Sequence, residues 1–251
     1  MSSPAWRVFA NPVTLFVGGV AAVLLELAEP RVRHGVWDNS TFRTDPLARL
    51  KRTGLAALVT VYGPASAARA MIERIGRLHA RVSGVTDGGT PYRADDPELL
   101  DWVQATASWG FLEAFSAFDA PVSAPDRDTY YRDVAPVAAL YGATGAPRTD
   151  AEAKALIQRM RPNLEPSATL QEFLAIMRRV PALPPAARPL QRPLLKAAVS
   201  LLPPGLAQNL HLTNWRLSAL EHAMVQTAAR TAGRLDLEAW PGHQARRRLA
   251  L

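Results

Sequence analysis

The 251-residue sequence contains no cysteine. Disulfide bonds, thiolate metal sites and cysteine nucleophiles are therefore excluded, and only His, Asp, Glu, Tyr or Met side chains could ligate a metal ion. Histidine is also scarce, and its five positions are His34, His79, His211, His222 and His243. We interpret the last three as structural or exposed residues, because none of them has neighbours that resemble a ligand set.

Lysine is almost missing, although the chain is basic. The 29 Lys+Arg against 22 Asp+Glu give a formal charge of +7 and a pI of about 10.3, and nearly all of the positive charge is arginine. The sequence has no basic region with interleaved aromatic residues and no recognisable nucleic-acid-binding module. We therefore expect no nucleic-acid partner. The basic segment 236–251 is expected to be a solvated tail with at most a weak contact to anionic lipid.

An apolar run long enough to cross a membrane is missing as well. The segment VTLFVGGVAAVLLELAEP, which starts at Val13, reaches Glu26 before it attains the roughly 20 apolar residues that a bilayer requires. Arg7 precedes this run, but no convincing cleavage site of a signal peptide follows it. We predict a buried helix over 13–28 and a cytoplasmic protein, and we leave peripheral membrane attachment open.

Alternating apolar and polar residues at strand length are nearly absent, whereas helical periodicity and helix caps recur. The predicted helices cover residues 13–28, 46–62, 65–82, 97–118, 124–141, 167–179, 186–201 and 213–233. Asp45 is expected to cap the helix 46–62, and Asp95 or Asp96 the helix 97–118. Thr149 and Glu152 resemble a capping box that opens one more helix, and Pro136 predicts a kink. We find no internal repeat and no clean domain linker. The sequence therefore predicts a single all-α domain.

A basic cluster stands at the start of the predicted helix 46–62. Arg49, Arg52 and Thr53 occupy positions i, i+3 and i+4, so they share one helix face. The apolar run GLAALVTVYG follows Thr53 directly, so the face cannot be wholly exposed. An isolated buried guanidinium is costly, and we expect this face to meet an anion. The alternative is a helix start whose arginines pair with nearby carboxylates of the chain.

His79 lies on the apolar face of the predicted helix 65–82. The stripe on this face consists of Ala68, Ile72, Ile75, His79 and Val82, at spacings of four, three, four and three. From spacing alone, a histidine in such a stripe is more often a core residue than a ligand. Two cationic side chains near one buried histidine suit a haem, because the imidazole would ligate the iron and the arginines would pair with the propionates.

Three segments carry a family resemblance: LAEPRVRHGVWDNSTFRTDPLARLKRT, VYGPASAARAMIERIGRLHARVSGV and PYRADDPELLDWVQAT. In combination they resemble the MpaB/rubber-oxygenase catalytic domain family, over about residues 12–230. The resemblance implies a single helical-bundle domain over 12–235 with a globin-like haem pocket between its helices. Residues 1–11 would then form an N-terminal extension and residues 236–251 a basic C-terminal tail.

The resemblance also implies a cofactor and a reaction. Family members carry haem b with one helix histidine as the proximal iron ligand, and His79 matches that position. Arg49, Arg52 and Thr53 match the arginine, the lysine or arginine, and the threonine near the haem of rubber oxygenases. Because a guanidinium does not readily lose its proton, Arg52 is assigned to polarising oxygen in the distal pocket, not to iron ligation. The implied partners are dioxygen and an apolar, unsaturated small molecule or polymer.

Further candidates follow from the same resemblance. Family rubber oxygenases use an acidic residue as a candidate base, and Glu26 and Glu29 lie in the corresponding region, although either could be a surface carboxylate. Arg161 is a candidate propionate partner, or else caps the end of its helix. Trp102 is a candidate wall of the haem site, although an aromatic stripe of this kind is more often part of a core.

Some positions depart from the family pattern. Glu29 stands in the stretch before Pro30 where histidine is common, and Asn39 and Gln104 occupy two further positions where histidine is frequent. These departures leave three hypotheses open. The chain is a haem-dependent oxygenase, a haem-binding carrier or sensor without turnover, or a haem-free helical interaction protein. The sequence does not identify the substrate or the oligomeric state.

Overall fold

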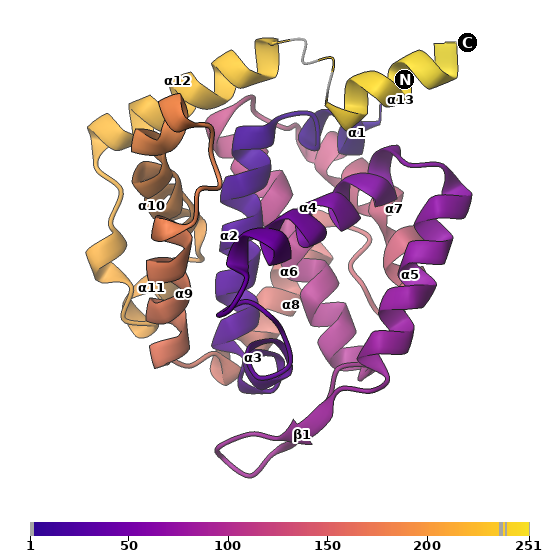
Figure 1. Ribbon diagram of the computed structural model, residues 1–251, viewed down its shortest axis with the longest axis vertical. Coiled ribbons are helices and arrows are strands. Elements are labelled where there is room, and N and C mark those ends of the chain that lie inside the picture. Colours follow the sequence, from indigo (N-terminus) through magenta and orange to yellow (C-terminus); the bar gives the residue numbers. More distant parts are fainter. Residues whose placement is uncertain (1–2, 236–237, 239, 251) are drawn as a thin grey trace.

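Two apolar helices, α2 (Pro12–Ala28) and α6 (Pro97–Phe118), run along each other through the centre of the computed structural model (Figure 1). Their backbones meet at Gly18 and Gly110, where a Cβ atom added to either residue would collide with the carbonyl group of the other. This approach therefore requires glycine at both positions. The structure describes residues 3–235, 238 and 240–250.

The other elements surround this pair, and the described part of the chain is all-α, as predicted, apart from one short hairpin. The α-helices are α1 (Pro4–Val8), α3 (Pro30–Trp37), α4 (Pro46–Tyr62), α5 (Ala65–His79), α7 (Ala124–Leu140), α8 (Asp150–Met160), α9 (Ala168–Arg179), α10 (Gln191–Leu201), α11 (Leu206–Asn209), α12 (Ala219–Arg234) and α13 (Pro241–Ala250). Three 3₁₀ helices cover Arg161–Asn163, Pro185–Leu190 and Thr213–Trp215. The hairpin pairs β1 (Ser83–Val85) with β2 (Pro91–Arg93) in antiparallel register.

The main core lies between α2 and the helices α9, α10 and α12, which cover one side of the central pair (Figure 1). Leu24 and Leu25 of α2 are completely buried in it, together with Leu174 of α9 and Leu195 of α10. Burying a leucine side chain contributes roughly 1.5–3 kcal/mol. This side of the molecule therefore supplies much of the hydrophobic stabilisation of the fold.

The opposite side, formed by α4 and α5, is packed much less tightly. Tyr62 is the one residue of α4, and Ile72 the one residue of α5, that is buried among the described residues. Leu55 in the middle of α4 is 59% exposed, although its sequence surroundings are apolar. Figure 1 shows α4 crossing in front of α6, with α5 beyond it. These two helices carry most of the predicted site.

Helix starts agree with the caps expected from the sequence. Asp45 accepts a hydrogen bond from the Ala48 amide at 3.3 Å and starts α4, and Asp96 and Thr149 cap α6 and α8 in the same way. Helix ends agree less well. The predicted helix 186–201 is a 3₁₀ helix up to Leu190 before α10 begins, because the prolines in this stretch supply no N–H groups for α-helical bonds.

The hairpin was not predicted, and it shortens α5. The helix ends at His79, three residues before the predicted end, and the chain then turns through β1 and β2. Tyr92 of β2 stacks on the His34 ring of α3 with 6.3 Å between the ring centroids. His34 also lies 2.9 Å from the Asp38 carboxylate. The strands are only three residues long, so contacts with α3 supply the support that two isolated strands lack.

Both ends of the described chain pack against the end of α4. Trp6 of α1 meets the Tyr62 ring edge-on at a centroid distance of 5.0 Å, and the Tyr62 hydroxyl donates to the Trp6 carbonyl at 2.7 Å. Arg248 of α13 donates to the Tyr62 carbonyl at 2.6 Å, and Ala245 is buried. The described part of the C-terminal segment is thus a docked helix and not the solvated tail expected from its charge. The boundaries of the oxygenase-like domain stay a prediction.

The described residues contain no single helix that is long and apolar enough to cross a membrane. Together, α2 and α3 reach that length and composition only as a pair bent by 111°.

Candidate functional site

The predicted site residues are contributed by three helices. Glu26 lies near the end of α2, Arg49 in the second turn of α4, and His79 at the last position of α5. Burial is the main cause of the pKa shifts of Glu26, which is upward, and of His79, which is downward, and the charge of Arg49 acts on both groups in the downward direction. The structure therefore brings together three residues that stand far apart in the sequence, with the guanidinium as their common neighbour.

Thr53 holds Arg49 in place from the next turn of α4. The Arg49 guanidinium donates to the Thr53 hydroxyl, and that hydroxyl donates to the Arg49 carbonyl at 3.0 Å. Burial is the main cause that lowers the pKa of Arg49, and the Glu26 carboxylate acts in the opposite direction. An arginine nevertheless stays protonated at any physiological pH. Arg49 is therefore a fixed, half-buried positive charge.

Arg52 points to the loop that precedes α4. Its guanidinium donates to the Thr41 hydroxyl at 2.8 Å, and both residues are exposed. Among the described residues, no carboxylate lies within 4.0 Å of Arg49 or Arg52, so neither pairs with Asp45, Glu73 or Asp101. The structure thus lacks the ion pairs that the haem-free alternative requires of these two arginines.

His79 is half-buried and electrically neutral at physiological pH. Burial, followed by the nearby charge of Arg49, lowers its pKa, and Asp95 opposes them. Asp95 is itself held by Arg93 through two hydrogen bonds of 2.9 and 2.8 Å. No hydrogen bond or ion pair reaches the His79 ring from the described part of the chain. A neutral imidazole is the form that ligates a metal.

Glu26 interrupts the apolar sequence of α2 and contacts α6. Its Oε1 atom lies 3.3 Å from the hydroxyl of Thr106, which is completely buried on α6. Burial raises the pKa of Glu26 to about 7, and the Thr106 hydrogen bond and the Arg49 charge oppose this shift. A carboxyl group that titrates near neutrality can accept and return a proton at working pH.

Three other predicted residues have different surroundings. Glu29 caps α3, where it accepts from the Val32 amide at 2.8 Å and pairs with Arg31 at 2.7 Å. Arg161 donates to the Pro204 carbonyl at 2.8 Å, in the connection between α10 and α11. Trp102 is completely buried in the main core, and its indole N–H has no partner in the described structure. The structure therefore does not group these residues with His79.

Sequence reasoning missed Thr106 and Thr41. Thr106 lies between Trp102 and Trp109 on the aromatic stripe of α6, where it is the polar exception. A polar residue on a core-facing stripe needs a partner, and this signal could have identified it. Thr41 gave no comparable signal, because it belongs to an exposed loop whose path toward Arg52 depends on tertiary packing.

The donor set fits a haem better than a bare metal ion. Within the described residues, no group of three or more His, Asp or Glu side chains could hold a metal by itself. One neutral histidine is the protein ligand of many haem irons, for which the porphyrin supplies the in-plane bonds. Two arginines without carboxylate partners suit the propionates of such a group.

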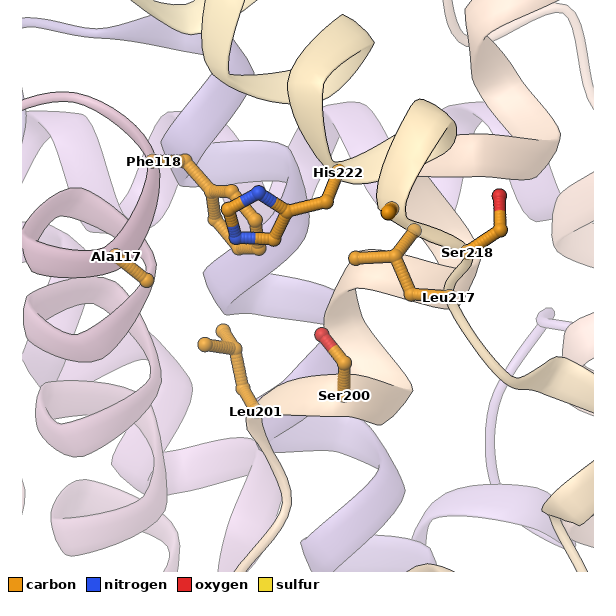
Figure 2. A pocket seen from close by; sticks show the side chains of 8 residues that line it. Ala117, Phe118, Ser200, Leu201, Leu217, Ser218 and His222 are labelled. Carbon is orange, nitrogen blue, oxygen red and sulfur yellow. The ribbon is translucent and has the colours of Figure 1, made fainter.

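A surface pocket of about 430 Å³ lies elsewhere, among α6, α10 and α12 (Figure 2). The His222 ring packs against Phe118 there at an interplanar angle of 50°, with 5.4 Å between the ring centroids, and Leu201 and Leu217 extend the apolar wall. None of the predicted site residues lines this pocket. It is therefore separate from the group around Arg49.

Comparison with family models places the chain among known proteins. The model described as "ER-bound oxygenase mpaB/B'/Rubber oxygenase, catalytic domain" matches residues 6–234. Comparisons with curated proteins and with solved structures found no match. The matched range contains the whole group of Glu26, Arg49, Arg52, Thr53 and His79.

Proposed function

The chain belongs to the mpaB/rubber oxygenase catalytic domain family, and from this premise we propose that it is a haem b-dependent oxygenase. It would use dioxygen to cleave an apolar, unsaturated substrate of the isoprenoid or lipid class. The observation that carries the proposal is the neutral imidazole of His79, which has no hydrogen-bond partner among the described residues and lies near a fixed arginine charge. The family match by itself supports an oxygenase-type domain.

His79 would hold the haem iron from the proximal side. Its place at the end of α5 supports this role, because the helix backbone precedes the residue and the Val82 amide, just before β1, donates to the His79 carbonyl at 2.9 Å. The lowered pKa keeps the ring nitrogen available for a metal bond at neutral pH. When bound, haem supplies the binding and activation of dioxygen, while the protein sets access and polarity.

Arg49 and Arg52 would provide positive charge on the α4 side of the site. The bond between Arg49 and Thr53 keeps one guanidinium in a defined orientation, which suits a carboxylate of the cofactor. Among the described residues, Thr41 is the one hydrogen-bond partner of the Arg52 side chain, which could turn toward negative charge that develops on oxygen. Thr53 would orient Arg49 and would not act on the substrate directly.

Glu26 would serve as the proton acceptor, and the apolar stripes beside it would receive the substrate. Val23 on α2, and Val103 and Ala107 on α6, are partly exposed in the same stretches of helix as Glu26 and Thr106. A pKa of about 7 lets the Glu26 carboxylate take a proton from a substrate carbon atom and release it again. The size of the substrate is left open by these residues.

Absorption spectroscopy tests the proposal. Purified wild-type protein, reconstituted with haem, should show a Soret band and a positive pyridine haemochrome assay, and His79→Ala should lose most of both. His222→Ala is the matched control, since His222 is another half-buried helix histidine but lies outside the group. Full haem content and an unchanged spectrum in His79→Ala would refute the ligand assignment.

Product analysis separates the oxygenase from the carrier or sensor. The reconstituted protein is incubated with an unsaturated isoprenoid, with and without dioxygen, and carbonyl products are measured. Oxygen-dependent carbonyl formation supports turnover. Stable haem binding without such products for isoprenoid and fatty-acyl alkenes would favour the carrier or sensor, an outcome in line with the substituted positions Glu29, Asn39 and Gln104.

A further inference from the structure

Thr106 lies within hydrogen-bond distance of three oxygen atoms inside the protein. Its hydroxyl is 3.3 Å from Oε1 of Glu26, 3.1 Å from the carbonyl oxygen of Trp102 and 3.0 Å from that of Val103. The Thr106 side chain is completely buried, whereas Glu26 is partly exposed. A hydroxyl has a single proton to donate but also accepts hydrogen bonds. It can therefore donate to only one of these oxygen atoms at a time.

The two protonation states of Glu26 need opposite partners. An ionised carboxylate only accepts hydrogen bonds, whereas a protonated carboxyl group also donates one. The Thr106 hydroxyl can donate to Oε1 when Glu26 is ionised. When Oε1 carries a proton, the hydroxyl can accept a hydrogen bond from it and donate its own proton in a hydrogen bond to the Trp102 or Val103 carbonyl. This exchange requires only rotation about the Cβ–Oγ1 bond.

We infer that Thr106 is a positioning residue for Glu26, whose hydroxyl keeps the carboxyl group in one place in both of its protonation states. The inference rests on the proposed function, in which Glu26 accepts and returns a proton. Among the described residues, Arg49 from α4 is the charged group that acts on this carboxyl, and Thr106 is its hydrogen-bond partner. The carboxyl group thus has a neutral hydrogen-bond partner that can bond to both of its protonation states.

A simpler role for Thr106 would predict a different result. Buried threonines often bond back to the carbonyl groups of their own helix, and such a bond alone would leave Glu26 unaffected. Thr14 of α2 is a comparable case, since it is almost completely buried and donates to the Asn11 carbonyl at 3.3 Å. Thr14→Val is therefore the matched control for the loss of a buried threonine hydroxyl.

Infrared difference spectroscopy of the whole purified protein measures the titration of Glu26, and Glu26→Gln identifies its carboxyl band. The hydroxyl bonds more strongly to the ionised carboxylate than to the neutral carboxyl group, so in Thr106→Val the midpoint should move to higher pH by on the order of tenfold in proton concentration. Thr106→Ser keeps the hydroxyl and should retain the wild-type midpoint, as should Thr14→Val. If Thr106→Val folds poorly, Thr106→Ala removes the same hydroxyl without adding volume.

The outcomes separate this inference from the proposed function. A shifted Glu26 titration in a protein that oxidises no alkene would support the role of Thr106 and remove the oxygenase proposal. In an active enzyme, the acidic limb of the kcat profile should move to higher pH by the same factor, and KM should stay nearly constant. An unchanged midpoint in both Thr106→Val and Thr106→Ala would overturn the inference, whatever the activity.

Discussion

The two sides of the α2–α6 pair differ in how they use burial and charge. On the side of α9, α10 and α12, the side chains of these helices pack against those of α2 in a core that includes many fully buried leucines. On the side of α4 and α5, each helix buries one residue, and the polar residues Glu26, Arg49 and His79 gather instead. One side supplies stability, and the other leaves charge and apolar surface accessible for chemistry.

Glycine substitutions test this difference most severely. Gly18→Val should prevent folding or cost more than about 4 kcal/mol, because a side chain at this position meets the backbone of α6. Gly54→Ala on α4 meets nothing within 4 Å and should stabilise the helix by roughly 0.5–1 kcal/mol. Chemical denaturation of both variants measures the free energy of unfolding. Similar values for the two would show that the sides do not differ in packing.

Arginine substitutions compare a paired charge with an unpaired one. Arg127 is mostly buried and contacts the carboxylates of Glu113 and Asp150, so Arg127→Gln removes the cation that pairs with Glu113 and leaves Asp150 paired with Lys154. We expect a loss of about 3 kcal/mol in the free energy of unfolding, measured by urea denaturation.

Arg49→Gln is the counterpart on α4. Since no described carboxylate lies within ion-pair distance of Arg49, its loss should change the stability of haem-free protein by less than about 1 kcal/mol. Haem affinity, measured by titration, should nevertheless fall. If Arg49→Gln destabilised the haem-free protein as much as Arg127→Gln, the charge on α4 would be structural.

Glu26→Gln tests the α4 side of the molecule through an effect on stability that depends on pH. Because the folded protein raises the pKa of Glu26 from 4.5 to about 7, its contribution to stability is complete below pH 4.5 and is lost as the pH rises through 7. Wild type should therefore lose up to about 3 kcal/mol relative to Glu26→Gln across this interval. Urea denaturation of both proteins at a series of pH values measures it, and parallel curves would contradict the raised pKa.

Local sequence signals predicted much of the secondary structure. Asp45, Asp96 and Thr149 start their helices as expected, because a cap interacts with amides only two or three residues away. The orientation of His79 also followed from helical spacing, since Ile72 is buried and the arginines of the same segment are exposed. The hairpin 83–93 escaped prediction because its support comes from His34 on another helix.

The choice among candidate residues depended on distant contacts. Glu26 and Glu29 are equally plausible bases in the sequence, but Glu29 is occupied by the Val32 amide and Arg31, whereas Glu26 faces Thr106 from another helix. From the sequence, Arg161 could pair with a propionate or cap the end of its own helix. In the structure its side chain donates to the carbonyl of Pro204.

The order of amino acids along the chain was enough to specify an all-α domain, the starts of its main helices and the basic face of α4, because caps and helical periods act over a few neighbouring residues. The pKa of Glu26 near 7 and the meeting of Arg49 with His79 arise only when α2, α4, α5 and α6 are packed together. Burial and charge act through space, so residues that are 80 positions apart in the sequence, such as Glu26 and Thr106, can determine each other's chemistry.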